Sequence, residues 1–147
     1  MKRILLCTDG EEQTARAERT ALDLALQNGA LLVGLYVVDP FLKKFTHEIY
    51  AINRDACRDH LDRLLREQGE KALEALANKA EAEGIRFESR MRYGSPEEEI
   101  LKEIDEQSYD LLVMGSKLLK GWRQRMESVN LPRRVFMNAP ISLLFVR

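Results

Sequence analysis

The amino-acid sequence predicts an α/β protein with a single open parallel sheet of five strands and helices on both faces. Two observations lead to this prediction. Short apolar runs alternate with segments of helical periodicity along the chain, and three of these runs, 4–7, 30–38 and 111–114, are continuously apolar. Continuous apolar runs are typical of strands buried on both faces, and strict alternation of strand and helix implies parallel strands joined by right-handed crossovers.

Length and composition indicate one ordinary globular domain over residues 1–147, with 45% apolar and 32% charged residues. The 23 basic and 24 acidic residues nearly cancel, so we expect no nucleic-acid partner and no anionic membrane partner. The sequence contains no apolar run of the roughly 20 residues that a membrane span needs. Cys7 and Cys57 form neither a C-x-x-C pair nor a metal cluster. We therefore expect a cytoplasmic protein with two buried, reduced thiols.

The first half of the chain predicts two strands and two helices. The first strand, residues 4–7, ends at Thr8-Asp9-Gly10, and a helix with acid in its first turn, at Glu11 and Glu12, runs to Asn28-Gly29. Residues 41–54 after the second strand lack clear periodicity and are expected to be a loop or an irregular helical start. A long helix from Arg54 to Gly84 is expected to place on one face Cys57, Leu61, Leu64, Gln68, Ala72, Ala75, Leu76 and Lys79.

The second half predicts an edge strand, two helices and two further strands. Residues 85–93 alternate in a way that predicts one covered face and one wet, charged face carrying Arg86, Glu88, Arg90 and Arg92. Ser95, Pro96 and Glu98 predict a helix start with a capping box. After the strand at 111–114, residues 131–138 can form a short helix, and 141–146 a final strand.

Candidate functional residues follow three of the predicted strands. In an open parallel sheet, ligands bind beyond the carboxyl ends of the strands, where the winding reverses. Asp9 can accept hydrogen bonds from a ligand's amine or hydroxyls, or it can cap the following helix. Asp39, before Pro40, is typical of a turn. Gly115 either lets a ligand approach the backbone closely or makes a turn.

Several enzyme classes lack their motifs in this sequence. It contains no G-x-x-x-x-G-K-[ST], no G-x-G-x-x-G after a strand and no G-x-S-x-G elbow. His47 and His60 have no paired ligand spacing, and we interpret both as partly exposed structural residues. Without a nucleophile, base or metal, we expect no enzymatic activity.

Four segments together resemble the universal stress protein family: ILLCTDGEEQTARAERTALDLA at 4–25, LYVVDP at 35–40, YGSPEEEILKEIDEQSYDLLVMGSK at 93–117 and APISLLFVR at 139–147. The resemblance implies a Rossmann-like, adenine-nucleotide-hydrolase-like sheet of order 3-2-1-4-5, commonly in a homodimer. It also implies that Asp9 and Val37 occupy the positions that hold an adenosine. The candidate nucleotide-contacting residues are Asp9, Val37, Met114, Gly115 and Ser128.

The nucleotide loop that the family resemblance implies is broken in this sequence. ATP-binding members show G-x-x-G-x9-G-[ST], whose glycines let backbone amides wrap the phosphates. Gly115 fits the first position and Ser128 the last, but Leu118 and Glu127 replace two glycines, and the loop is one residue short. Pro132 further opposes a helix starting at Ser128. A carboxylate near the phosphates would repel them.

The resemblance therefore favours a regulatory or stress-tolerance factor that acts through protein clients, with no cofactor. The alternative is an adenine-nucleotide protein that binds ATP or AMP. Its anion would be held by basic side chains of the stretch 117–134, unless this is only a solvated basic loop. The basic side chains of this stretch are Lys117, Lys120, Arg123, Arg125, Arg133 and Arg134. Trp122 lies among them in the sequence and is expected to be a packing residue or a partner contact.

The last predicted strand also favours a homodimer. Residues 141–146 carry no charge before Arg147, whereas the opposite edge strand is charged. An apolar edge with unpaired amides can pair with the same strand of a second copy across a two-fold axis.

Overall fold

The five strands predicted from the sequence lie in one parallel sheet. The computed structural model describes residues 1–39, 54–115 and 131–147, without the side chains of residues 13, 54–58, 131–133 and 136. The strands are β1 (Arg3–Cys7), β2 (Leu31–Val38), β3 (Phe87–Tyr93), β4 (Leu111–Gly115) and β5 (Ser142–Val146). Their order is β3-β2-β1-β4-β5, and every neighbouring pair is parallel. The predicted fold class is confirmed.

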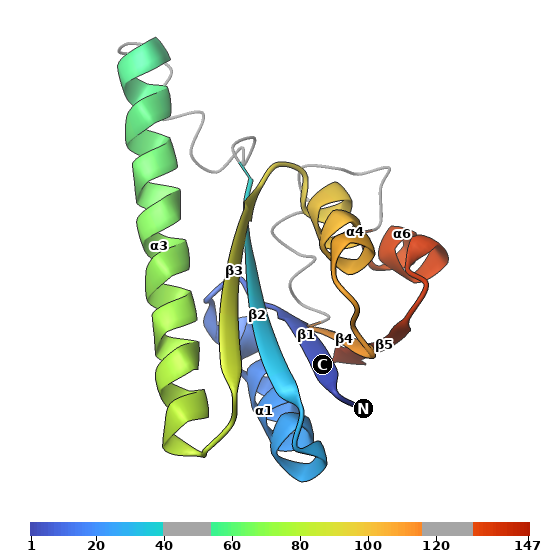
Figure 1. The fold of residues 1–147 in the computed structure, drawn as a ribbon. Helices are drawn as coiled ribbons and strands as arrows, with labels where there is room; N and C mark the ends of the chain where they lie inside the picture. Colours follow the sequence, from blue (N-terminus) through green and yellow to red (C-terminus); the bar gives the residue numbers. More distant parts are fainter. Residues whose placement is uncertain (40–53, 116–130) are drawn as a thin grey trace.

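Helices cover both faces of the sheet (Figure 1). On one face lie α1 (Ala15–Asn28) and α3 (Arg54–Ala82), and on the other lie α4 (Pro96–Glu106) and α6 (Leu131–Asn138). The face under α1 and α3 is built on buried residues such as Ile4, Leu6 and Leu32, and the opposite face on residues such as Leu5, Val33 and Leu112. The apolar runs of the sequence are thus buried on both sides, as predicted.

The first helix begins later than its acidic residues predict. A single 3-10 turn, η1 (Glu12–Thr14), precedes α1, and the Thr14 amide donates to the Glu11 carbonyl at 3.1 Å. The predicted end is confirmed, because Gly29 has a left-handed φ of 60° and its amide bonds back into the helix. No helix within the described ranges is both long and apolar enough to cross a membrane.

The buried stripe of α3 differs from the predicted one. Leu61 and Leu76 are buried, but Gln68, Ala75 and Lys79 are exposed. The stripe passes instead through Gly69, where an added Cβ would lie 2.7 Å from side-chain atoms of both Tyr36 and Met91. A glycine contributes no apolar side chain to the periodicity, so the pattern concealed the face that packs on the sheet. The residues of the observed stripe are Leu61, Leu65, Gly69, Leu73, Leu76 and Ala80.

Two predictions at β3 and α4 are wrong. Arg92 was predicted on a wet face, yet its side chain is only 18% exposed because glutamates of α4 cover it. The capping box is absent, since Ser95 makes no side-chain capping bond and Glu98 is exposed. α4 begins with Pro96 after Ser95 at the N-cap position, and the Glu99 amide donates to the Ser95 carbonyl at 3.0 Å.

Candidate functional site

The carboxyl ends of β1, β2 and β4 meet at one edge of the sheet. Cys7, the last residue of β1, pairs with Leu35 of β2 and with Met114 of β4. The Thr8 amide continues this ladder by donating to the Leu35 carbonyl at 3.0 Å. Asp9 follows Cys7 by two residues, and Val37 follows Leu35 by two residues within β2. The structure thus brings together the segments that the sequence singled out.

Asp9 stabilises its own turn. Its Oδ1 accepts a hydrogen bond from the Glu11 amide at 2.9 Å and from the Thr14 hydroxyl at 3.1 Å. Asp9 does not cap a helix, because the N-cap residues of η1 and α1 are Glu11 and Thr14, and neither makes a side-chain capping bond. Its hydrogen bonds hold the turn between β1 and η1 instead. Its side chain is partly exposed at the sheet edge.

A buried polar cluster that the sequence analysis missed lies below Asp9. The Thr8 hydroxyl donates to Glu18 Oε1 at 2.8 Å and accepts from the Gly10 amide at 3.1 Å. Glu18 is 8% exposed and its other oxygen lies 3.3 Å from Lys79 Nζ of α3. These contacts tie the loop after β1 to both helices of this face. The sequence signal that could have revealed this cluster is Glu18 itself, because it is a carboxylate beside Ala17 on the apolar face of α1.

The loop after β1 lies directly against α3. Gly10 has a φ of 73°, and an added Cβ would lie 2.7 Å from the Cβ of Ala72. A side chain at Gly10 would be strained by both the backbone angle and the contact. The loop therefore packs directly against α3 at Gly10.

The other predicted site residues have different surroundings. Val37 is partly buried and Asp39 is 2% exposed. The Met114 side chain is 1% exposed and belongs to the core under α4, so only its backbone faces the edge. Gly115 ends β4, and an added Cβ would lie 3.5 Å from Thr14 Cγ2, an ordinary contact. Ser128 lies outside the described residues.

The remaining predicted residues are only partly covered by the described chain. Arg134 of the basic stretch is exposed and pairs with Glu97 of α4, with 2.8 Å between Nη1 and Oε2. His60 is exposed on α3. Cys57 lies in α3 without a described side chain. The segments 40–53 and 116–130, with His47, Trp122 and the rest of the nucleotide loop, lie outside the described residues.

Two titratable groups near this edge, the Tyr36 phenol and the Cys7 thiol, are held in their neutral form. Burial, with smaller contributions from Asp9 and Glu11, raises the pKa of Tyr36. Burial, and then the charge of Glu103, raises the pKa of the Cys7 thiol far above its ordinary value. Cys7 is therefore a protonated core residue and no nucleophile. Among the described residues, no group of three His, Cys, Asp or Glu could hold a metal ion. The described edge offers hydroxyls and carboxylates, which suit the amine and hydroxyl groups of a ligand.

The fold and the position of this edge define a doubly wound α/β protein with its candidate site beyond the carboxyl ends of the strands. Comparison with known proteins gives the family. The model of the universal stress protein family matches residues 1–147, and the chain belongs to that family. Universal stress protein MJ0531 of Methanocaldococcus jannaschii is 28% identical over 148 residues, which cover 99% of this chain and 82% of that protein.

Solved structures of the same family share the fold. A member from Burkholderia pseudomallei superposes with a TM-score of 0.76 at 22% identity, covering 99% of this chain and 95% of the other. A universal stress protein in complex with cAMP superposes with a TM-score of 0.67 at 23% identity, covering 99% and 96%.

Proposed function

We propose that this universal stress protein is a regulatory or stress-tolerance factor that acts in the cytoplasm through contacts with other proteins, without catalysing a reaction. The observation that carries this proposal is the replacement of two glycines of the nucleotide loop by Leu118 and Glu127. Leucine rarely adopts the left-handed backbone that glycine allows, and a carboxylate at position 127 opposes bound phosphate.

The surroundings of Asp9 support the same proposal. In a nucleotide-binding member this carboxylate would serve the adenosine, whereas here Oδ1 accepts two hydrogen bonds from its own turn. The turn is further held by the Thr8 and Glu18 contacts. Asp9 thus has a structural role that does not need a ligand.

We further propose a homodimer through β5. This strand forms one edge of the sheet beside β4, and its residues Leu143 to Val146 are partly exposed. Antiparallel pairing of β5 with the same strand of a second copy would cover these side chains and satisfy the edge amides. At the opposite edge, β3 presents charged side chains, which disfavour such pairing.

A second candidate function is adenine-nucleotide binding. The observation that favours it is the likeness to a universal stress protein whose structure holds cAMP. Side chains of the basic stretch would then replace the missing backbone amides, although Arg134 already pairs with Glu97 at 2.8 Å.

Mass spectrometry of small molecules that co-purify with the folded protein distinguishes the two candidate functions. The protein is denatured, and the released small molecules are compared with those from a nucleotide-binding protein purified in parallel. We expect no stoichiometric adenine nucleotide. Its release at about one per chain would favour the second candidate.

A further inference from the structure

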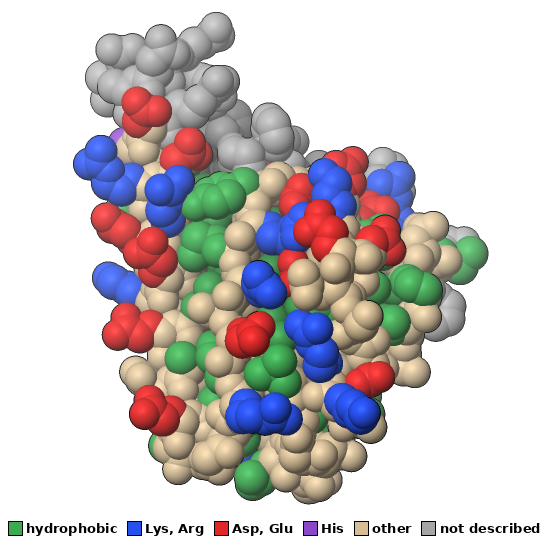
Figure 2. Space-filling view, in the orientation of Figure 1, with side chains coloured by type: hydrophobic (Ala, Val, Ile, Leu, Met, Phe, Trp, Pro, Cys, Tyr) green, Lys and Arg blue, Asp and Glu red, His purple; other side chains and the backbone are tan. Residues whose placement is uncertain are grey.

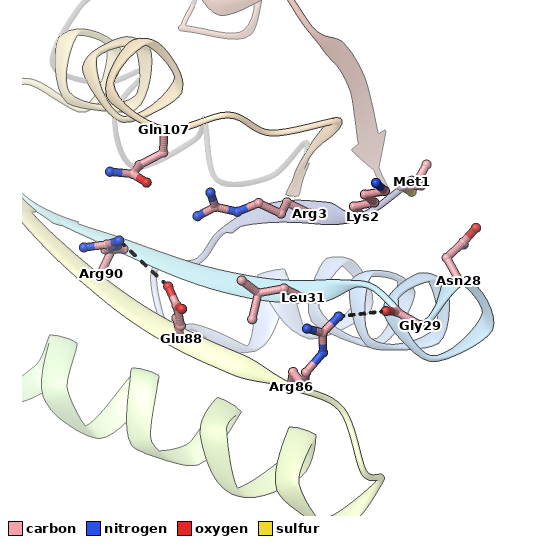
Figure 3. Close-up of a pocket in the computed structure, with 10 residues that line it drawn as sticks. All are labelled: Met1, Lys2, Arg3, Asn28, Gly29, Leu31, Arg86, Glu88, Arg90 and Gln107. Carbon is pink, nitrogen blue, oxygen red and sulfur yellow. Dashed lines mark hydrogen bonds and ion pairs between the residues drawn. The ribbon is translucent and has the colours of Figure 1, made fainter.

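A hollow lies at the amino-terminal edge of the sheet, opposite the candidate nucleotide site (Figure 3). Its volume is ≈ 680 Å³, and it is lined by the beginnings of β1, β2 and β3 and by Gln107 after α4. This volume falls within the range of small-molecule sites, about 300–1,000 Å³. The hollow is separate from the loops at which Asp9 and Gly115 lie.

The charged side chains around the hollow are mostly cationic. Lys2, Arg3, Arg86 and Arg90 line it against the single carboxylate of Glu88. That carboxylate lies 3.8 Å from the Arg90 guanidinium, and both side chains are more than 40% exposed, so the pair neutralises little. Figure 2 shows Lys and Arg side chains on this open part of the sheet, beside the acidic residues that gather over α4.

The register of the sheet explains why basic side chains gather here. Glu88 pairs with Val33 and Arg90 with Leu35, so these β3 side chains share a face with the core that packs under α4. Further along β3, Arg92 reaches the α4 glutamates and is neutralised. Arg86, just before the strand, donates to the Gly29 carbonyl at 3.1 Å and remains exposed.

Two guanidinium groups in the hollow are held in place but incompletely paired. The Arg3 guanidinium lies 5.0 Å from the centroid of the Tyr109 ring, a cation–π contact. The Nε atoms of Arg3 and Arg90 are buried and have no hydrogen-bond acceptor among the described residues. Arg90 Nε lies 3.7 Å from Glu103 Oε1. In Figure 3 the side chains of Arg3, Arg90 and Gln107 converge on one part of the hollow.

We propose that this hollow is a ligand site for a small phosphate-bearing anion. Fixed guanidinium groups bind phosphate oxygens in a bidentate manner through their terminal nitrogens. Several cations in one hollow call for a ligand with more than one negative charge, which a diphosphate supplies. The amide of Gln107 can contribute a neutral donor beside the charged groups. This inference is independent of the proposed function, because the two sites lie at opposite edges of the sheet.

Titration of ¹⁵N-labelled protein with inorganic pyrophosphate, followed by amide chemical shifts at low ionic strength, tests the proposal. We expect saturable shifts at Arg3, Leu31, Arg86 to Arg90 and Gln107. Arg3→Gln combined with Arg90→Gln should weaken binding by about tenfold or more, since each substitution removes a charge-assisted contact. Arg86→Gln, at an exposed position, should weaken pyrophosphate binding by about threefold. It provides the test if the double variant does not fold. The matched control is Arg63→Gln, an exposed arginine of α3, which should bind as the wild type does.

Three outcomes would overturn the proposal. One is the absence of saturable shifts with the wild-type protein. Another is shifts confined to Asp9, Val37 and Gly115, which would place the anion at the candidate nucleotide site and leave the hollow without a ligand. The third is equal or tighter binding of citrate, which would make the hollow a carboxylate site.

Discussion

Arg92 of β3 donates to Glu103 of α4 with 2.8 Å between Nη1 and Oε2, although Glu103 is only 3% exposed. The same guanidinium contacts Glu99 through Nε at 2.9 Å and Glu106 through Nη1 at 3.0 Å. The Tyr109 hydroxyl donates to the other oxygen of Glu103 at 2.7 Å. This network joins the edge strand β3 to α4 and to the residues that lead into β4.

Replacing Arg92 should therefore destabilise the fold strongly. Arg92→Met leaves the buried carboxylate of Glu103 without its closest cation, and we expect the free energy of unfolding to fall by about 3 kcal/mol. Urea denaturation followed by circular dichroism measures the change. Arg86→Met, at an exposed position just before β3, is the control and should change stability by less than about 0.5 kcal/mol. Equal effects of the two substitutions would contradict the role of the network.

Asp9→Ala tests whether Asp9 serves the turn or a ligand. Loss of the bonds from the Glu11 amide and the Thr14 hydroxyl should lower stability by about 1 kcal/mol. Because we propose no nucleotide there, thermal unfolding should show the same loss with and without ATP–Mg²⁺. Asp59→Ala, an exposed aspartate of α3, is the control. A nucleotide-induced rise in melting temperature that disappears in Asp9→Ala would assign Asp9 to a ligand.

The stability of the protein should fall in alkaline solution, in part through Tyr109. Burial, followed by the hydrogen bond to Glu103, raises the pKa of Tyr109 above its ordinary value of 10.0. Above that value the unfolded chain loses the phenolic proton first, so this contribution to stability is complete below pH 10 and declines as pH rises toward the folded-state pKa.

Urea unfolding between about pH 8 and pH 11 should show this slope. In Tyr109→Phe it should be shallower by up to about 1.4 kcal/mol per pH unit, the contribution of one proton. Part of the pH dependence should remain in Tyr109→Phe, because burial also raises the pKa of Tyr36. Tyr93→Phe, at an exposed tyrosine, is the control. An unchanged slope in Tyr109→Phe would show that this hydroxyl titrates normally.

The proposed dimer predicts a specific effect of proline in β5. Leu144 pairs with Val113 of β4 in the middle of β5, and Leu144→Pro removes a backbone donor from the strand. Sedimentation at tens of micromolar should give a dimer for the wild type, a dimer for Leu144→Ala, and a monomer or aggregate for Leu144→Pro. A wild-type monomer, or a dimer that survives the proline, would exclude this interface.

The sheet could be predicted from the sequence because its central strands are continuous apolar runs separated by turn residues. What escaped prediction depends on contacts between distant segments. The buried face of α3 passes through Gly69, which contributes no apolar side chain. The alternation of residues 85–93 predicts Arg92 on the wet face. It gives no sign of the α4 glutamates that cover Arg92, because these lie seven or more residues further along the chain.

The candidate site was predictable only in outline. The strand ends that carry Asp9, Val37 and Gly115 meet as expected, because parallel strands end at one edge. The sequence left two roles open for Asp9. The hydrogen bonds that it accepts depend on the position of Thr14 at the end of a 3-10 turn, which the acidic residues did not predict. The basic hollow at the opposite edge draws on three strands and on Gln107, so no local pattern marks it.

Calorimetric titration with ATP–Mg²⁺ tests the proposed function most directly. The wild-type protein is compared with the double variant Leu118→Gly, Glu127→Gly, which supplies the two missing glycines of the loop. We predict no saturable heat from the wild type in the micromolar range and tighter binding by the double variant. One-to-one binding by the wild type with a Kd of about 1 µM or below, about −8 kcal/mol, would contradict the account.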